Sequence, residues 1–395
     1  MSSLARSAMS ARLAKLPPMP PGSEDAEGDE SDGLGALPSS SSTRGAAARS
    51  RPSPAPGKFD ITAGVPRDEK ALGNPFYSPI SAQGFFEQAV QVDVAAAGLD
   101  LRAYYTPPKL SSSDAKGTVC VCHHGAGFSG LSFAHLARQL TQQTSGELGV
   151  LAFDARGHGK TAYKELPEPR ALDLSLARLS SDLVEILSTL FPDPRQSPNF
   201  VFVGHSMGGA VVVDACPVLL AKGFKIVGAV VVDVVEGSAM DALPHMHALL
   251  ASRPRDFASV EEGIEWHLTT HTMSNVDSAR VSIPSTLLAP AEEGGHWKWR
   301  TPLASTAPFW EGWFTDLSSK FLATRAARLL VLAGTDRLDK PLMIGQLQGK
   351  FQLVIVPGVG HLVHEDDPGR TAEILIEFWR RNDRVVPGVK KVGEE

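Results

Sequence analysis

The chain has 395 residues, of which 43% are hydrophobic, so it is long and apolar enough to bury a sizeable core. Its 38 basic and 44 acidic residues give a net charge of −6 with both signs mixed along the sequence, which argues against nucleic acid or an anionic membrane surface as a partner. No apolar run approaches the roughly 18 residues that a membrane-spanning helix needs, so we expect a soluble globular protein without a membrane partner.

The first 70 residues differ in composition from the rest of the chain. They are rich in proline and serine and poor in large apolar side chains, so residues 1–70 are predicted to be a disordered low-complexity tail. Residues 1–16 combine basic residues and serines with no acidic residue, which is typical of mitochondrial transit peptides as well as of basic disordered tails. Residues 388–395 form a short charged tail at the other end.

Three cysteines, Cys120, Cys122 and Cys216, bear on the cellular compartment. Cys120 and Cys122 alternate within one predicted strand, and neighbours on the same face of a strand do not normally form a disulfide. The pattern therefore favours a reducing compartment. We expect a cytoplasmic or nuclear protein, with mitochondrial targeting through residues 1–16 as the alternative.

Strand and helix patterns alternate through residues 71–387, the predicted globular domain. Two alternating runs at 88–94 and 99–105 predict a hairpin at a sheet edge. Short apolar runs that predict buried strands follow at 118–122, 149–153, 200–203, 227–232, 328–333 and 351–356. Helices are predicted at 131–144, 175–191, 207–221 and 368–381. This alternation predicts an α/β fold with a mostly parallel, doubly wound sheet.

A segment at about 240–325 interrupts this alternation between two predicted strands. It contains five tryptophans: Trp266, Trp297, Trp299, Trp310 and Trp313. An insertion at this place is expected above the carboxyl ends of the strands, where ligands bind in open α/β sheets. We interpret it as a cap over the site, with the alternative that the tryptophans form only the core of the cap itself.

The sequence Gly204-His205-Ser206-Met207-Gly208 follows a short apolar strand and precedes a helical run. This is the pattern of a nucleophile elbow, in which a serine stands on a sharp strand-to-helix turn between small residues. The backbone N–H of Met207 would then donate to a developing oxyanion at the helix N-terminus. The alternative is an ordinary glycine-rich turn in another α/β protein.

The segment from His123 to Phe128 directly follows a predicted strand, where α/β-hydrolases place the loop that supplies a second oxyanion N–H. Its small residues Gly125, Ala126 and Gly127 allow the backbone to approach a substrate carbonyl. We expect the donor to be the N–H of Ala126 or of Gly127. His124 is expected to be structural, since a base at this position would break the usual chain order.

His361 lies on a glycine-containing loop after the last predicted strand, where a general base can reach back to the serine. His364 is the nearby competitor and is expected to pack or cap instead. Two acids preserve the order serine, acid, histidine: Asp233 and Asp336 each follow an apolar strand. The residues alone leave the choice between these two carboxylates open.

Several blocks resemble the protein phosphatase methylesterase family of α/β-hydrolases. They are residues 203–210, 233–243, 310–314, 333–340, 348–352 and 360–366, within a resemblance that covers about 76–381. The family triad corresponds to Ser206, Asp233 and His361, with Asp336 as the alternative acid. The block at 154–159 departs slightly, having alanine where the family usually has leucine.

The resemblance implies that the substrate is the carboxymethylated C-terminal leucine of the catalytic subunit of type 2A serine/threonine phosphatases. Ser206 would form an acyl-enzyme with release of methanol, without metal or organic cofactor. The cap tryptophans and Met240 are candidate walls for the leucine. Two other classes stay open: a carboxylesterase of small molecules, favoured by efficient turnover of short esters, and a non-catalytic phosphatase-binding scaffold, which the intact triad argues against.

Overall fold

The computed structural model describes residues 74–110, 116–164, 172–292, 294–334 and 338–383. The predicted tails at 1–70 and 388–395 and the candidate acid Asp336 lie outside these residues. Within the described ranges, no helix combines the length and the apolar character required to cross a bilayer.

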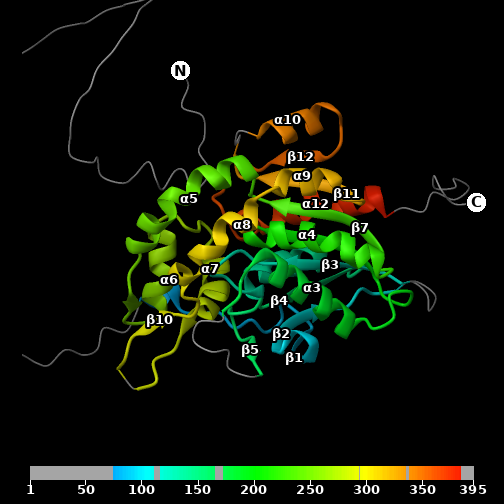
Figure 1. Ribbon diagram of the computed structural model, residues 1–395. Helices are drawn as coiled ribbons and strands as arrows, with labels where there is room; N and C mark the ends of the chain where they lie inside the picture. The colour runs from blue at the N-terminus through cyan, green and yellow to red at the C-terminus, as the bar shows by residue number, and fades with distance from the viewer. Residues whose placement is uncertain (1–73, 111–115, 165–171, 293, 335–337, 384–395) are drawn as a thin grey trace, which may run out of the picture. The chain divides into compact units, whose positions relative to one another are not determined.

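The described strands form a mostly parallel sheet in the order β1-β2-β4-β3-β6-β7-β11-β12, with β5 paired to β2 (Figure 1). β1 and β2 form the predicted antiparallel hairpin, β2 is also antiparallel to β4, and the pairs from β4 to β12 are parallel. The strands are β1 Gln88–Val94, β2 Leu99–Thr106, β3 Thr118–His123, β4 Leu148–Phe153, β5 Ala162–Tyr163, β6 Asn199–His205, β7 Ile226–Val232, β11 Ala327–Leu332 and β12 Gln352–Ile355. The prediction of the sheet from the sequence is confirmed.

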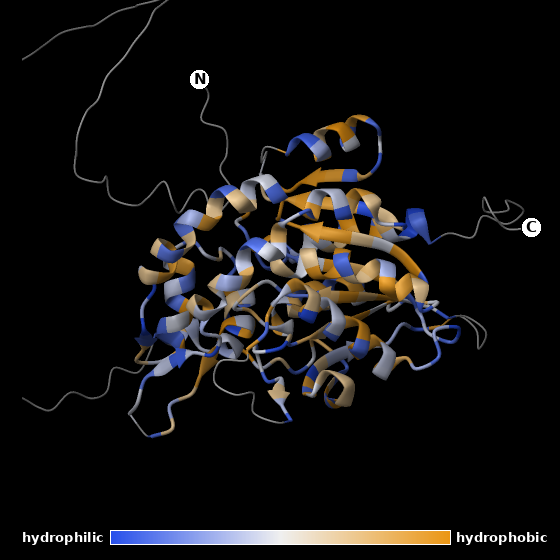
Figure 2. Cartoon of the chain, viewed as in Figure 1, coloured by the Kyte–Doolittle hydropathy of each residue, from blue (hydrophilic) through white to orange (hydrophobic). Residues whose placement is uncertain are grey.

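Helices cover both faces of this sheet because its central strands are apolar on both faces (Figure 2). Every residue of β3, β4 and β7 is buried. α3 Leu176–Leu190 and α4 Met207–Ala221 pack on one face, and α2 Ala134–Gln143 and α12 Pro368–Asn382 pack on the other. The four predicted helices are confirmed, except that the first begins as a short 3₁₀ segment, η3 Gly130–Phe133.

The chain between β7 and β11 forms helices and a small antiparallel sheet of order β8-β10-β9. Its elements are α5 Glu236–Ala251, β8 Asp256–Phe257, α6 Val260–Thr269, α7 Val276–Ser282, η4 Ile283–Thr286, β9 Leu287–Leu288, β10 Trp297–Trp299, η5 Leu303–Phe309, α8 Trp310–Phe314 and α9 Leu317–Ala323. Trp266, Trp297 and Trp299 pack against a separate apolar cluster of this segment, whereas Trp310 and Trp313 belong to the main core. Trp266, Trp297 and Trp299 therefore fit the alternative that the tryptophans form the core of the insertion itself.

Candidate active site

Ser206 occupies the single residue between β6 and α4, with φ 52° and ψ −120°. A positive φ is strained for a residue with a Cβ, and strain of this kind is stored at functional sites. The turn also requires its flanking glycines. A Cβ at Gly204 would lie 2.2 Å from Gly208 O, and one at Gly208 would lie 2.2 Å from His123 O. The pinched backbone of a nucleophile elbow, predicted from the glycine spacing, is thus present.

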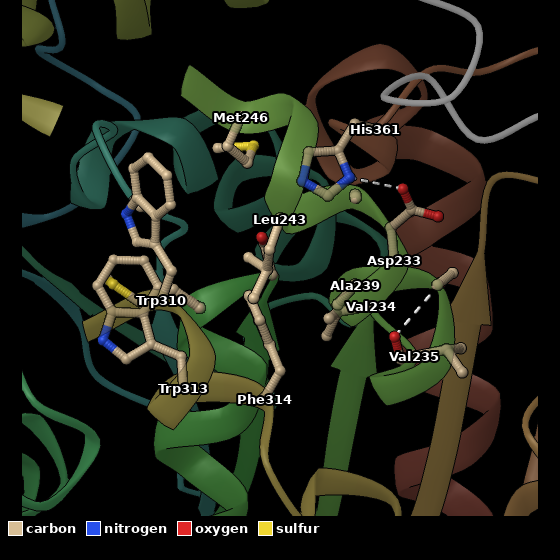
Figure 3. A pocket seen from close by; sticks show the side chains of 15 residues that line it. Asp233, Val234, Val235, Ala239, Leu243, Met246, Trp310, Trp313, Phe314 and His361 are labelled. Carbon is tan, nitrogen blue, oxygen red and sulfur yellow. Dashed lines mark hydrogen bonds and ion pairs between the residues drawn. The ribbon is translucent and has the colours of Figure 1, made fainter. Parts of the chain in front are cut away.

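Asp233 directly follows β7 and also has a positive φ, 52°. Its side chain is 1% exposed, and both carboxylate oxygens have hydrogen-bond donors. Oδ1 accepts from the backbone N–H of Ala333 at 2.8 Å, and Oδ2 lies 2.7 Å from His361 Nδ1 (Figure 3). The carboxylate that contacts the histidine is therefore Asp233, held in one orientation by the backbone of the neighbouring strand's end.

His361 lies between β12 and α11 Val363–Asp366, and its side chain is 25% exposed. The neighbouring Gly360 N–H donates to Asp366 Oδ2 at 2.7 Å, which fastens the loop from one side. His364 lies differently: its ring is fully buried and stacked on Phe133, with 4.4 Å between ring centroids. Burial lowers the pKa of His364 to about 3, so this histidine packs in the core as a neutral ring.

The loop at 124–128 brings Ala126 and Gly125 to Ser206. Ala126 and Met207 line the pocket at Ser206, and a Cβ on Gly125 would lie 3.3 Å from the Ser206 Cβ. The N–H of Gly127 is engaged elsewhere, since it donates to His158 Nε2 at 3.0 Å. Of the two expected donors in this loop, the Ala126 N–H is therefore the one that the geometry favours.

His124 is a structural residue of this loop. Its Nδ1–H donates to Gly125 O at 2.9 Å, and its Nε2 accepts from the Ala155 N–H at 2.9 Å. Burial holds the pKa of this ring well below the usual histidine value, so it stays neutral. With both nitrogens occupied, His124 is not available as a base.

The block at 154–159 supports the loop in a way that sequence reasoning missed. His158 Nδ1–H donates to Arg156 O at 2.8 Å, which leaves Nε2 free to accept from Gly127. Asp154 accepts from the N–H groups of Gly130 at 2.8 Å and Lys160 at 2.7 Å. Burial raises the pKa of Asp154 to about 6. The only signal in the sequence was a histidine four residues after this aspartate. That spacing does not identify Gly127 as the residue that the histidine contacts.

An apolar pocket opens beside the three side chains Ser206, Asp233 and His361. Two elements of the insertion supply its walls: Ser238, Ala239, Ala242, Leu243 and Met246 come from α5, and Trp310, Trp313 and Phe314 from α8. Figure 3 shows Leu243 and Met246 of α5 opposite His361, with Trp310 and Trp313 of α8 beside them. The α5 residues recur at the three- and four-residue spacing of one helix face. Met240, expected as a wall, lies off this face and is not among the lining residues, whereas Met246 is. Trp266, Trp297 and Trp299 are likewise not among the lining residues.

The fold and the elbow geometry define the class of protein. Residues 120–374 match the model of the alpha/beta hydrolase family. Solved structures with the same fold include E-2-(acetamidomethylene)succinate hydrolase, 20% identical with a TM-score of 0.57 over 74% of this chain and 99% of that chain. An esterase of M. tuberculosis is 21% identical with a TM-score of 0.54, covering 74% of this chain and 92% of that one.

Curated relatives define the family within this class. Proteins named protein phosphatase methylesterase 1 are 48% identical in Cryptococcus neoformans, over 80% of this chain and 81% of the relative, and 46% identical in Emericella nidulans, over 78% of each. The relative of that name in Yarrowia lipolytica is 40% identical over 90% of this chain and 85% of its own length. The chain belongs to the protein phosphatase methylesterase 1 family. The resemblance inferred from the sequence blocks is confirmed.

Proposed function

We propose that the chain is a serine carboxylesterase that removes the methyl group from the carboxymethylated C-terminal leucine of the type 2A phosphatase catalytic subunit. The observation that carries the proposal is the 2.7 Å hydrogen bond between His361 Nδ1 and Asp233 Oδ2, set beside an elbow serine in an apolar pocket. The family supplies the substrate class, since its members are named for acting on a protein phosphatase. The triad that the resemblance implies is Ser206, Asp233 and His361.

The reaction begins with the attack of Ser206 Oγ on the carbonyl carbon of the methyl ester. His361 Nε2 takes the hydroxyl proton, and Asp233 holds the imidazole in the Nδ1–H tautomer that leaves Nε2 free to do so. Collapse of the tetrahedral intermediate breaks the bond to the methoxy oxygen, which leaves as methanol with the proton from His361. Water, deprotonated by His361, then attacks the acyl-enzyme and releases the free carboxylate and the serine.

The oxyanion is stabilised by two backbone N–H groups, those of Met207 and Ala126. Met207 is the first residue of α4, so its N–H is not used in the helix and the helix dipole adds to its effect. Ala126 faces the same pocket from the loop that His124 and His158 hold in place. Two fixed donors of this kind are the arrangement that acyl transfer requires.

The apolar wall suits a leucine side chain. Leu243, Met246, Trp310, Trp313 and Phe314 present carbon atoms over most of the pocket, and burying a leucine side chain contributes about 2 kcal/mol. No residue of α5 is fully buried, so the wall on that side is partly open to solvent. An open wall of this kind allows a protein tail to enter while the body of the phosphatase stays outside.

The test is the intact mass of the methylated phosphatase catalytic subunit after incubation with the chain, beside turnover of a short ester such as p-nitrophenyl acetate. We expect loss of the methyl group with the wild type and not with Ser206→Ala. Methyl loss in neither sample, together with Ser206-dependent turnover of the short ester, would replace the proposal by a small-molecule carboxylesterase. Methyl loss with Ser206→Ala as well would remove Ser206 as the nucleophile.

A further inference from the structure

His205 is the residue just before Ser206. It makes a hydrogen bond to the loop that carries His361. Its Nε2 lies 2.9 Å from the backbone O of His361. A carbonyl oxygen can only accept, so Nε2 carries the proton and donates. Among the described residues, Nδ1 has no hydrogen-bond partner. A neutral ring with its single proton on Nε2 therefore makes the hydrogen bond that is observed and leaves Nδ1 unprotonated.

The ring of His205 is fixed by close packing. It is 1% exposed, and its centroid lies 4.6 Å from that of His361 and 4.7 Å from that of His364. On the side of Nδ1, the backbone of Gly125 is so near that a Cβ there would lie 2.7 Å from the nitrogen. These contacts hold the ring so that its donor faces the carbonyl of His361.

The loop that carries His361 needs such an anchor. It contains Gly358, with φ 80°, and Gly360, and glycines give a backbone more conformational freedom than any other residue. The hydrogen bond from Gly360 N–H to Asp366 fixes the loop within its own segment. The bond from His205 ties the backbone of His361 to the residue that adjoins Ser206.

We propose that His205 is a positioning residue: by holding the carbonyl of His361, it sets the distance between the base and the nucleophile. This inference rests on the proposed function, because it assumes that His361 is the base for Ser206. A displacement of about 1 Å between reacting groups can lower a rate by about a hundredfold. His205 acts through His361 and has no role as a proton donor or acceptor in the reaction.

The first experiment compares His205→Met with His205→Gln on p-nitrophenyl acetate. The glutamine retains an N–H donor near the position of Nε2, whereas the methionine has a similar length and no donor. We expect His205→Met to lower kcat by about 10- to 100-fold with little change in KM, and His205→Gln to recover most of the loss. The matched control is His364→Leu, which removes a buried imidazole beside the same ring that has no hydrogen bond to the described residues. We expect this control to keep its kcat.

A kcat for a folded His205→Met near that of the wild type would overturn the inference. So would an equal loss in His205→Met and His205→Gln, or an equal loss in His205→Met and His364→Leu. A second measurement needs no variant and so does not depend on the folding of a variant. It is the ¹⁵N chemical shifts of the histidine rings in the wild-type chain. The inference requires protonated Nε2 and unprotonated Nδ1 in His205, and the opposite tautomer would overturn it. Ester turnover that survives in Ser206→Ala would instead contradict the proposed function itself.

Discussion

At the scale of single residues, the chemistry of the site depends on which carboxylate faces the histidine. Asp233 and Asp336 each follow a strand, so the sequence could not choose between them without the family resemblance. The structure adds a contact that no linear pattern contains: Asp233 is held by the Ala333 N–H from the adjacent strand's end and faces His361. The elbow was predictable because its requirement for glycine is local. The acid was not, because its partner is far along the chain.

Replacing Asp233 by asparagine should lower kcat by about 10³- to 10⁴-fold, because an amide at this position favours the imidazole tautomer with the proton on the catalytic nitrogen. Steady-state turnover of a short ester checks this, with the folded state verified by near-UV circular dichroism. An Asp233→Asn variant with wild-type kcat, alongside loss in Asp336→Asn, would transfer the role of the acid to Asp336.

Replacing His158 by leucine should lower kcat by about tenfold, because the Gly127 N–H loses its acceptor and the loop that carries Ala126 is no longer held. His158→Gln supplies an oxygen that can accept the same hydrogen bond, so it should lose less. Turnover of a short ester by both variants is the measurement. Equal activity in His158→Leu and the wild type would show that the loop keeps its place without this bond.

At the scale of elements, the pocket is built where α5 and α8 meet the carboxyl ends of β6 and β7. The strands and the helices of the sheet were predictable, since their apolar patterns are long and regular. The wall was not. Met246 rather than Met240 faces the pocket because the helix begins at Glu236 and turns one face inward, and a phase of this kind depends on tertiary packing.

Glu236 fixes α5 relative to α9, and so the position of the wall. Its carboxylate accepts from the N–H groups of Asp316 and Ser318, each at 3.0 Å. Glu236→Ala should therefore raise KM for the methylated phosphatase by about three- to tenfold, with a smaller effect on kcat, and lower the free energy of unfolding by about 1–2 kcal/mol. Glu311→Ala on α8 is the control, since this glutamate is exposed. Identical KM values for the two variants would show that the hydrogen bonds of Glu236 do not determine the position of the pocket wall.

At the scale of the whole molecule, the buried histidines make folding sensitive to acid. Burial lowers the pKa of His123 and His158 to about 4 and that of His364 to about 3, and holds those of His124 and His205 well below the usual value. An unfolded histidine titrates near 6.5, so below that pH the unfolded chain binds more protons and stability falls. Asp154 and Glu365 oppose this trend, because burial raises their pKa values and the folded chain then binds the additional protons.

Five histidines outnumber the two carboxyl groups, and each such group changes the free energy of unfolding by at most about 1.4 kcal/mol per pH unit. The chain should therefore be less stable at about pH 5 than at about pH 7.5, by several kcal/mol. Urea denaturation at the two pH values measures this difference. A free energy of unfolding that is equal or higher at the acidic pH would mean that these histidines are not neutral and buried in the folded state.

The measurement that tests the central claim most directly is methanol release from purified, carboxymethylated type 2A phosphatase catalytic subunit, with the wild-type chain beside Ser206→Ala. We predict stoichiometric release of methanol with the wild type and none above background with the serine variant. No methanol from the wild-type chain, while it still hydrolyses a short ester, would contradict the claim that the phosphatase tail is the substrate of this site.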